Sequence, residues 1–174
     1  MSRTDYDLTR IRAFVFDIDG VLSPSTIPMD MNGVPQRMVN IKDGYAMQLA
    51  VKHGYLIAII TGADTPSIAT RYTALGIKEI HLKASVKLPI LRDLLKRHGL
   101  SPGQTVYVGD DIPDLPCMQE VGLSVAPADA AVEIKEIARY ISPRDGGQGV
   151  ARDIIRQVML ARGDWMDDRH AFGW

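Results

Sequence analysis

The sequence predicts an α/β fold: a Rossmann-like parallel sheet with helices on both faces. Two observations support this prediction. Short apolar runs alternate with helix-like segments along the 174-residue chain, and repeated strand–helix units of this kind are typical of a parallel sheet covered by helices. The first apolar run, Ala13 to Phe16, stops abruptly at Asp17, which is the pattern of a strand buried on both faces.

The expected elements follow one another along the chain. After the strand at 13–16, further strands are expected at residues 56–60, 79–82, 105–108, 123–126 and 140–142. Helices are expected at residues 43–53, 66–75, 86–98, 112–121, 132–138 and 150–161. Glycines stand at the ends of several of them, namely Gly54, Gly76 and Gly99. The helix at 86–98 has the clearest pattern, because its leucines share one face and its Lys and Arg residues lie opposite.

The segment from Ser23 to Asn40 interrupts this alternation. It carries several prolines and an Asn32-Gly33 pair, and Asn-Gly is a strong signal for a tight hairpin turn. We therefore expect a β-hairpin flap, over residues 23–40, beside the end of the first strand. No remaining segment is long enough for a second domain, so residues 1–174 are expected to form one domain with a C-terminal tail over residues 163–174.

Composition and charge narrow the range of partners. The formal net charge of −1 gives no electrostatic reason to expect nucleic acid or an anionic membrane as a partner. No apolar run approaches the length of a membrane span, and the polar start of the chain is unlike a signal peptide. The one cysteine, Cys117, is expected to be a small buried residue. We expect a cytoplasmic protein that binds neither nucleic acid nor membrane.

Polar side chains follow the predicted strands at the edge where the carboxyl ends of parallel strands meet. Ligands of open parallel sheets bind in the crevice outside these ends. The set comprises Asp17-Ile18-Asp19-Gly20 after the first strand, Thr61-Gly62 after the second, Gly109-Asp110-Asp111 with Asp114 one turn later, and Lys87 at the start of a helix. One rim of the sheet therefore carries several carboxylates, a hydroxyl and an ammonium group.

These residue types together suit phosphoryl transfer, in which positioning and charge neutralisation dominate. Clustered carboxylates favour a hard cation with oxygen ligands, Mg²⁺ above all. Lys87, Thr61 and backbone N–H groups can hold phosphate oxygens. Asp17 could accept the phosphoryl group, and Asp19 could protonate the leaving oxygen and later activate water against the aspartyl-phosphate. The residues thus indicate a magnesium-dependent phosphatase.

Four segments resemble the ordered motifs of the haloacid dehalogenase superfamily: residues 17–22, residues 60–62, Lys87 and residues 109–114. Residues 40–46, 122–126 and 146–153 are similar, more narrowly, to the 3-deoxy-D-manno-octulosonate 8-phosphate phosphatases. This similarity extends from Ile11 to Trp165, nearly the whole chain. Four motifs in the right order and spacing are a strong signal, whereas any one alone would be weak.

The resemblance implies a role for each matching acidic residue. It implies that Asp17 is the nucleophile and a metal ligand, and that Asp110 completes the ligands that the protein gives to Mg²⁺. Asp19 would be the acid/base and would contribute its backbone carbonyl to the metal. Asp111 and Asp114 would lie close by and support the site.

The resemblance also implies how substrate and subunits are arranged. Thr61, Gly62 and Lys87 would grip the phosphoryl group. The family lacks a large cap domain and forms tetramers, in which a neighbour's hairpin and C-terminal region help to cover the site. We therefore expect a homotetramer that hydrolyses a small phosphorylated sugar acid, 3-deoxy-D-manno-octulosonate 8-phosphate.

The sequence leaves two questions open: which substrate the protein binds and what Asp43 does. Members of the family often carry arginine after the Thr-Gly pair, whereas this chain has Ala63. A nine-carbon sugar acid 9-phosphate or another small phosphometabolite is therefore an alternative substrate, and Arg71 or Lys83 could replace the missing arginine. Asp43 is expected either to cap its own helix, since Asp favours that position, or to serve the substrate or the flap.

Other classes of protein share parts of this pattern. A phosphorylation-controlled receiver domain also places acidic residues, Thr or Ser, and Lys around Mg²⁺, but without the Asp-x-Asp-Gly pattern. A catalytically silent assembly domain is a second alternative, and the intact set of motifs argues against it. A phosphomutase would keep its aspartyl-phosphate, but mutases of this superfamily usually carry a helical cap for which the chain has no room.

Overall fold

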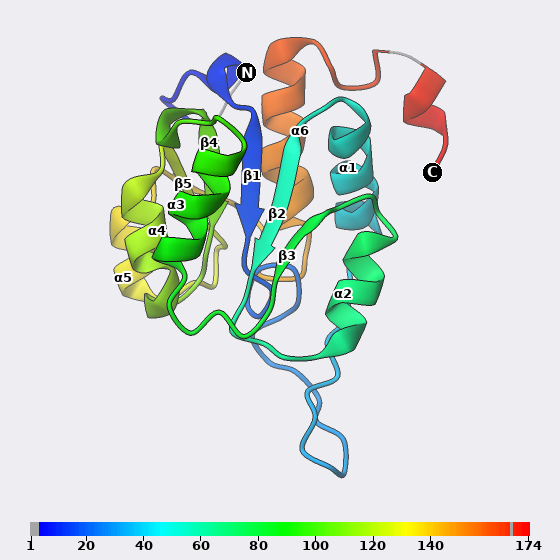
Figure 1. Ribbon diagram of the computed structural model, residues 1–174, viewed down its shortest axis with the longest axis vertical. Coiled ribbons are helices and arrows are strands. Elements are labelled where there is room, and N and C mark those ends of the chain that lie inside the picture. The colour runs from blue at the N-terminus through cyan, green and yellow to red at the C-terminus, as the bar shows by residue number, and fades with distance from the viewer. Residues whose placement is uncertain (1–3, 168) are drawn as a thin grey trace.

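The structure, a computed structural model, describes residues 4–167 and 169–174. Its strands form one sheet in the order β3-β2-β1-β4-β5-β6, and each neighbouring pair runs parallel. The strands are β1 (Ala13–Phe16), β2 (Leu56–Ile60), β3 (Glu79–His81), β4 (Thr105–Val108), β5 (Leu123–Ala126) and β6 (Tyr140–Ile141) (Figure 1). The predicted parallel α/β fold is confirmed.

Helices follow the strands as the alternating pattern predicts. They are α1 (Ile41–Lys52), α2 (Pro66–Thr73), α3 (Leu88–Arg97), α4 (Leu115–Glu120), α5 (Val132–Ile137) and α6 (Val150–Arg162). Short 3-10 turns span Leu8–Arg10, Pro102–Gln104, Ile112–Asp114 and Arg169–Phe172. The helix expected over 112–121 is thus split into a 3-10 turn and α4, each with a proline in its first two positions, where the missing N–H costs least.

The helices form a layer on each face of the sheet. Side chains of α1, α2 and α6 pack in one cluster with Phe14 and Phe16, and side chains of α3, α4 and α5 pack in a second cluster with Val15. Neighbouring β1 residues therefore point to opposite faces, as the two-residue period of a strand requires. Because every residue of β1 is buried, the loop that follows it starts from a rigid central strand.

The start of α1 differs from the first of the two expectations for Asp43, namely that it caps its own helix. The helix begins two residues earlier, and Asn40 is its N-cap, with a side chain that accepts from the N–H groups of Lys42 and Asp43. Asp43 is buried and accepts from the N–H of Arg152 at 2.7 Å, in the first turn of α6. Its carboxylate therefore caps the neighbouring helix.

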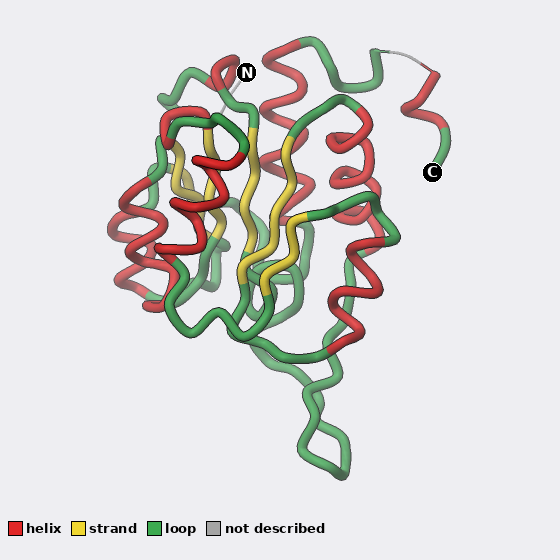
Figure 2. Tube along the Cα trace, in the orientation of Figure 1, coloured by secondary structure: helices red, strands yellow, loops and turns green. Residues whose placement is uncertain are grey.

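The flap, residues 23–40, reverses direction as a hairpin does but forms no regular strands. All of its residues are described, and its one antiparallel bridge joins Met29 to Pro35. The turn is closed by the N–H of Gly33, which donates to the carbonyl of Asp30 at 3.0 Å. Prolines cannot donate to a strand ladder, which explains why the paired strands do not extend. Figure 2 shows the flap as a long loop that projects beyond the carboxyl ends of the strands.

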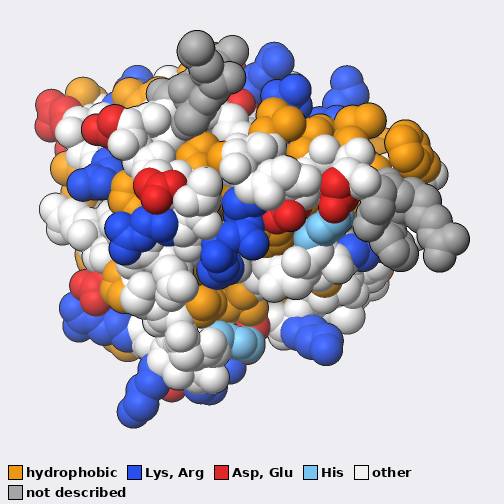
Figure 3. Space-filling model, turned by 90° about the horizontal axis from the view of Figure 1, so that it is seen from above, with side chains coloured by type: hydrophobic (Ala, Val, Ile, Leu, Met, Phe, Trp, Pro, Cys, Tyr) orange, Lys and Arg blue, Asp and Glu red, His pale blue; other side chains and the backbone are white. Residues whose placement is uncertain are grey.

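The tail packs on its own chain. Tyr45 of α1 donates from its hydroxyl group to the carbonyl of Ala171, and its ring meets Trp165 and Trp174 edge-on at centroid distances of 6.4 and 6.1 Å. Seen from the end opposite the flap, basic and acidic side chains are interspersed (Figure 3). Among the described residues, no helix is both long enough and apolar enough to cross a bilayer.

Candidate active site

The loops at the carboxyl ends of the strands enclose a cavity of about 470 Å³. Its lining includes the following residues of the predicted site: Asp17, Asp19, Thr61, Gly62, Lys87, Asp110, Asp111 and Asp114. These residues come from the ends of β1, β2 and β4 and from the start of α3, four places far apart in the sequence. The structure therefore brings together every predicted site residue except Asp43.

Lys87 joins two carboxylates at the floor of this cavity. Its Nζ atom lies 2.9 Å from Oδ2 of Asp17 and 2.7 Å from Oδ1 of Asp114, and its side chain is 4% exposed. The hydroxyl group of Tyr107, a buried β4 residue, donates to the same Asp114 oxygen at 2.8 Å. The N–H of Asp110 donates to the other Asp114 oxygen at 3.1 Å. Asp114 thus fixes both the lysine and the loop that carries Asp110.

Crowding of acidic groups shifts their pKa values. Burial, followed by the Asp114 charge, raises the pKa of Asp17 to about 6, against the opposing effect of Lys87. Burial, Asp114 and Asp17 together raise the pKa of Asp110 to about 8. Burial acts to lower the pKa of Lys87, but Asp114 and Asp17 outweigh it and the pKa is raised. Lys87 therefore carries its charge at neutral pH and only partly balances the carboxylates around it.

The donor set fits a divalent cation. Asp17, Asp110 and Asp114 each offer one carboxylate oxygen, and these oxygens lie within 4.8 Å of one another. Oxygen ligands without nitrogen or sulfur are what a hard cation such as Mg²⁺ prefers. Three carboxylates meet one ammonium group here, that of Lys87, so a cation would offset the remaining negative charge.

The loop after β1 depends on two glycines that allow close approaches. Gly20 has a φ of +79°, and a Cβ atom there would lie 1.8 Å from Oδ2 of Asp110. A Cβ atom on Gly146 would lie 2.1 Å from the carbonyl oxygen of Gly20. The neighbouring Gly147 donates its N–H to the carbonyl of Val21 at 2.8 Å. A glycine-rich loop near the end of the chain therefore packs directly on the loop that carries Asp17 and Asp19.

Thr61 and Asp111 occupy the positions that the motifs predict, with different degrees of burial. Thr61 is buried, and its hydroxyl oxygen accepts from the N–H of Ala63 at 3.2 Å. Asp111 is exposed and caps the turn that follows β4, where its carboxylate accepts from the N–H of Ile112 at 2.8 Å. Thr61 can present its hydroxyl proton to a phosphate oxygen, while Asp111 shapes the loop beside Asp110.

Arg37, which the sequence analysis missed, contacts the site through Asp19, a residue that lines the cavity. Its Nε and Nη2 atoms donate to the two carboxylate oxygens of Asp19 at 2.7 and 2.8 Å, and its Nη1 atom donates to Oγ1 of Thr65 at 2.7 Å. Nothing in the local pattern singles out this arginine, since only the path of the flap brings it to Asp19. The side-chain oxygens of Asp19 therefore face the flap.

Arg71 and Lys83, the two residues that could replace the missing arginine, lie outside the acidic cavity, as does Cys117. Arg71 packs on α1, where a Cβ atom added to Gly44 would lie 2.7 Å from its Nη2 atom. Lys83 pairs with Asp64 at 2.8 Å on the surface, with both side chains exposed. Cys117 is buried as predicted, and burial raises the pKa of its thiol to about 12. Among the residues that line the acidic cavity in the described part of the chain, neither Arg71 nor Lys83 replaces the missing arginine.

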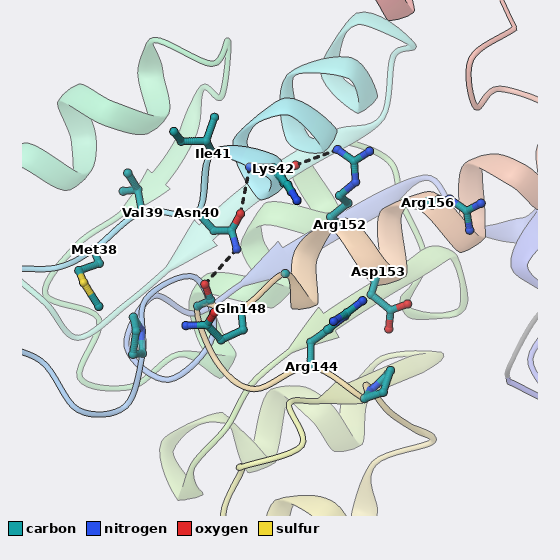
Figure 4. Close-up of a pocket in the computed structure, with 14 residues that line it drawn as sticks. Met38, Val39, Asn40, Ile41, Lys42, Arg144, Gln148, Arg152, Asp153 and Arg156 are labelled. Carbon is teal, nitrogen blue, oxygen red and sulfur yellow. Dashed lines mark hydrogen bonds between the residues drawn. The ribbon is translucent and has the colours of Figure 1, made fainter.

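A larger cavity, of about 880 Å³, lies between the base of the flap, the glycine-rich loop and α6 (Figure 4). Its charged lining residues are Lys42, Arg144, Arg152, Asp153 and Arg156. Its described lining contains none of the predicted nucleophile, acid/base or metal-binding residues. The acidic cavity is therefore the candidate active site.

Comparisons with known proteins identify relatives of this chain. A family model described as haloacid dehalogenase-like hydrolase matches residues 75–154. The chain is 39% identical over 153 residues to the 3-deoxy-D-manno-octulosonate 8-phosphate phosphatase KdsC of Escherichia coli strain K12, a match that covers 88% of this chain and 81% of that protein.

Two solved structures share the fold. The crystal structure of 3-deoxy-D-manno-octulosonate 8-phosphate phosphatase from Yersinia pestis has a TM-score of 0.87 and 34% identity, and the match covers 91% of this chain and 85% of that one. The phosphatase from Moraxella catarrhalis, solved with a magnesium ion, a phosphate ion and a KDO molecule, has a TM-score of 0.89 and 28% identity, with 96% of each chain covered. From its similarity over most of its length, the chain belongs to the 3-deoxy-D-manno-octulosonate 8-phosphate phosphatases, a family of phosphoric monoester hydrolases among the haloacid dehalogenase-like hydrolases.

Proposed function

We propose that this protein hydrolyses 3-deoxy-D-manno-octulosonate 8-phosphate to the free sugar acid and inorganic phosphate, with Mg²⁺ in the acidic cavity. The observation that carries this proposal is the buried Asp17 carboxylate beside Lys87, in one cavity with Asp110 and Asp114. The substrate named for the Escherichia coli relative supports the choice of sugar acid phosphate. The magnesium and phosphate ions bound to the Moraxella catarrhalis relative support the cofactor and the reaction class.

The residues of the cavity provide a two-step route. A carboxylate oxygen of Asp17 attacks phosphorus, the bond to the sugar oxygen breaks, and Asp19 gives that oxygen a proton. Asp19 then takes a proton from the water that attacks the aspartyl-phosphate, which releases phosphate and restores Asp17. Thr61, Lys87 and the N–H of Gly62 hold the phosphoryl oxygens through both steps.

The cation would be held by the acidic loops. Asp17 and Asp110 would bind it through carboxylate oxygens and Asp19 through its backbone carbonyl, with Asp114 close by. When bound, Mg²⁺ supplies the positive charge that offsets repulsion between the phosphate dianion and the carboxylates. Lys87 adds a second positive charge at a fixed position, because two carboxylates hold its ammonium group.

A nine-carbon sugar acid 9-phosphate is the second candidate substrate. Ala63 lines the cavity where family members often carry arginine, so the wall that meets the sugar differs in charge and size. A screen that compares eight-carbon and nine-carbon sugar acid phosphates decides between the two.

We also propose that the protein is a homotetramer. The flap exposes large apolar side chains, with Met29, Met31 and Met38 at 69%, 102% and 52% of their full accessibility. Clustered apolar side chains in water mark contact surfaces, and a second copy of the chain would cover them. The cytoplasmic location expected from the sequence stays a prediction.

Release of inorganic phosphate from a panel of phosphate esters tests the proposed function. The panel contains sugar acid phosphates of eight and nine carbons, common metabolite phosphates and p-nitrophenyl phosphate. Asp17→Asn should abolish turnover of every substrate, whereas Asp93→Asn, at an exposed position of α3, should not. Turnover that survives Asp17→Asn would contradict the assigned nucleophile.

A further inference from the structure

The guanidinium group of Arg37 holds the carboxylate of Asp19, a residue that lines the acidic cavity. It pairs with Asp19 in the bidentate geometry that arginine forms with carboxylates, with both contacts below 3 Å. The Arg37 side chain is 12% exposed and the Asp19 side chain 42% exposed. The Nη1 atom of Arg37 donates to Oγ1 of Thr65 at 2.7 Å. The guanidinium is thus fixed, while its carboxylate partner is the more accessible of the two.

This pairing conflicts with the role proposed for Asp19. A general acid has to carry a proton on an oxygen that reaches the leaving group. Both carboxylate oxygens of Asp19 instead accept charge-assisted hydrogen bonds from Arg37. The pair must therefore open before Asp19 can serve the leaving oxygen, and something must take its place on the arginine, because an unpaired guanidinium at low exposure is costly.

We propose that Arg37 recognises the carboxylate group of the substrate, which takes the place of Asp19 in the guanidinium fork. The two carboxylates have the same charge and planar shape, so the exchange conserves both hydrogen bonds. Asp19 would then turn to the leaving oxygen only when an acidic substrate is bound. This inference rests on the proposed function and names the residue that selects sugar acid phosphates over neutral sugar phosphates.

The surroundings of Arg37 favour it over the other cations of this rim. Lys87 is already paired with two carboxylates, those of Asp17 and Asp114, and the proposed function assigns it to the phosphoryl group. Lys83 is exposed and pairs with Asp64, whereas Arg37 pairs with Asp19, a residue that lines the cavity. Ala63 lines the cavity without charge, and Arg37 bonds to Thr65, two residues further along the same loop. The flap therefore supplies the positive charge that this loop does not.

Steady-state kinetics with two substrates test the proposal. The substrates are 3-deoxy-D-manno-octulosonate 8-phosphate and arabinose 5-phosphate, a sugar phosphate without a carboxylate. Arg37→Met should raise KM for the acidic substrate by about 10- to 100-fold. It should not lower kcat/KM for arabinose 5-phosphate, because the substitution frees Asp19 without removing any contact to that substrate. Arg37→Lys, which keeps the charge but not the fork, should restore part of the loss. Lys42→Met, an exposed lysine next to the flap, is the matched control and should behave as the wild type.

A binding measurement makes the test independent of turnover. Calorimetric titration with the free sugar acid, 3-deoxy-D-manno-octulosonate, in Mg²⁺ buffer should give a Kd weakened about tenfold or more by Arg37→Met and unchanged by Lys42→Met. Equal losses of kcat/KM for both substrates, or an unchanged Kd, would overturn the proposal. Should Arg37→Met fail to fold, as judged by circular dichroism, Arg37→Lys carries the same comparison.

The two proposals fail separately. A wild type that binds the free sugar acid through Arg37 but releases no phosphate from its 8-phosphate would refute the proposed activity and uphold the role of Arg37. Hydrolysis of the 8-phosphate by the wild type, with the same KM and Kd in Arg37→Met, would uphold the proposed activity and refute the role of Arg37.

Discussion

Lys87 and Asp114 form a buried ion pair in which Nζ of the lysine lies 2.7 Å from Oδ1 of the aspartate. Tyr107 donates to the same oxygen, so the carboxylate is held from β4 while the lysine reaches it from the start of α3. The ammonium group is therefore in position before any phosphate arrives, which spares the reaction the cost of ordering it.

Removing this ammonium group should reduce activity strongly. We expect Lys87→Met to lower kcat/KM by about 10²- to 10³-fold, because a preorganised positive charge at the phosphoryl group is lost. Lys83→Met is the control, since that lysine is exposed and pairs with Asp64 away from the cavity. Its kcat/KM should stay within about twofold of the wild type. Similar losses in the two variants would contradict a specific role for Lys87.

Removal of divalent metal should stop turnover. We expect EDTA to abolish phosphate release and added Mg²⁺ to restore it, since the acidic cavity holds more negative charge than Lys87 balances. Mg²⁺ at 100 times its Kd should also stabilise the folded protein by about 2.7 kcal/mol, measured as a rise in Tm. Asp110→Asn should lose most of this rise, and NaCl of equal ionic strength should not produce it. Full turnover in chelated buffer would refute the metal requirement.

Asp43 should make the free energy of unfolding depend on pH. Burial raises its pKa to about 6 from the ordinary value of 3.8, and hydrogen bonds from the backbone of Arg152 oppose this only in part. The folded state therefore binds the proton more tightly than the unfolded chain does. The stability that protonation contributes is full below pH 3.8 and is lost as the pH rises through about 6.

Comparison of wild type with Asp43→Asn isolates this effect, because asparagine can still accept from Arg152 but does not titrate. Relative to the variant, the wild type should lose about 1–3 kcal/mol of unfolding free energy between pH 4 and pH 7. Urea denaturation at several pH values measures the difference. Asp93→Asn, at an exposed position, should track the wild type at every pH. An unfolding free energy of the wild type that does not fall relative to that of Asp43→Asn as the pH rises would contradict the raised pKa of Asp43.

The exposed methionines of the flap should control assembly. We expect the wild type to sediment as a tetramer and Met31→Lys to shift it toward smaller species, since a charge would be buried in the contact. Lys96→Met, at an exposed position of α3, is the control for altered surface charge. A wild type that is monomeric and fully active at working concentration would contradict the proposed tetramer.

The buried strands and the acidic rim could be predicted from the sequence for a physical reason. Parallel strands covered on both faces have to be apolar throughout, so Ala13–Phe16 and Leu56–Ile60 stand out, and their carboxyl ends have to share one edge. That edge then brings Asp17, Thr61 and Asp110 together without any knowledge of their side-chain contacts.

The features that were missed depend on contacts between distant segments. Asp43 follows the local rule for a helix cap, yet α6 supplies the N–H group that its carboxylate accepts. Arg37 has no local pattern, and only the path of the flap carries it to Asp19. The flap itself was expected as a hairpin, but its prolines limit the pairing to the bridge between Met29 and Pro35.

The contact of Gly146 with Gly20 has a consequence for how the protein is made. The loop that carries Asp17 emerges from the ribosome early, whereas the glycine-rich loop that packs on it emerges after more than a hundred further residues. Long-range contacts of this kind form late in folding. The nascent chain should therefore acquire a working phosphate pocket only near the end of synthesis, and a truncation before Gly146 should leave the acidic loops without their final shape.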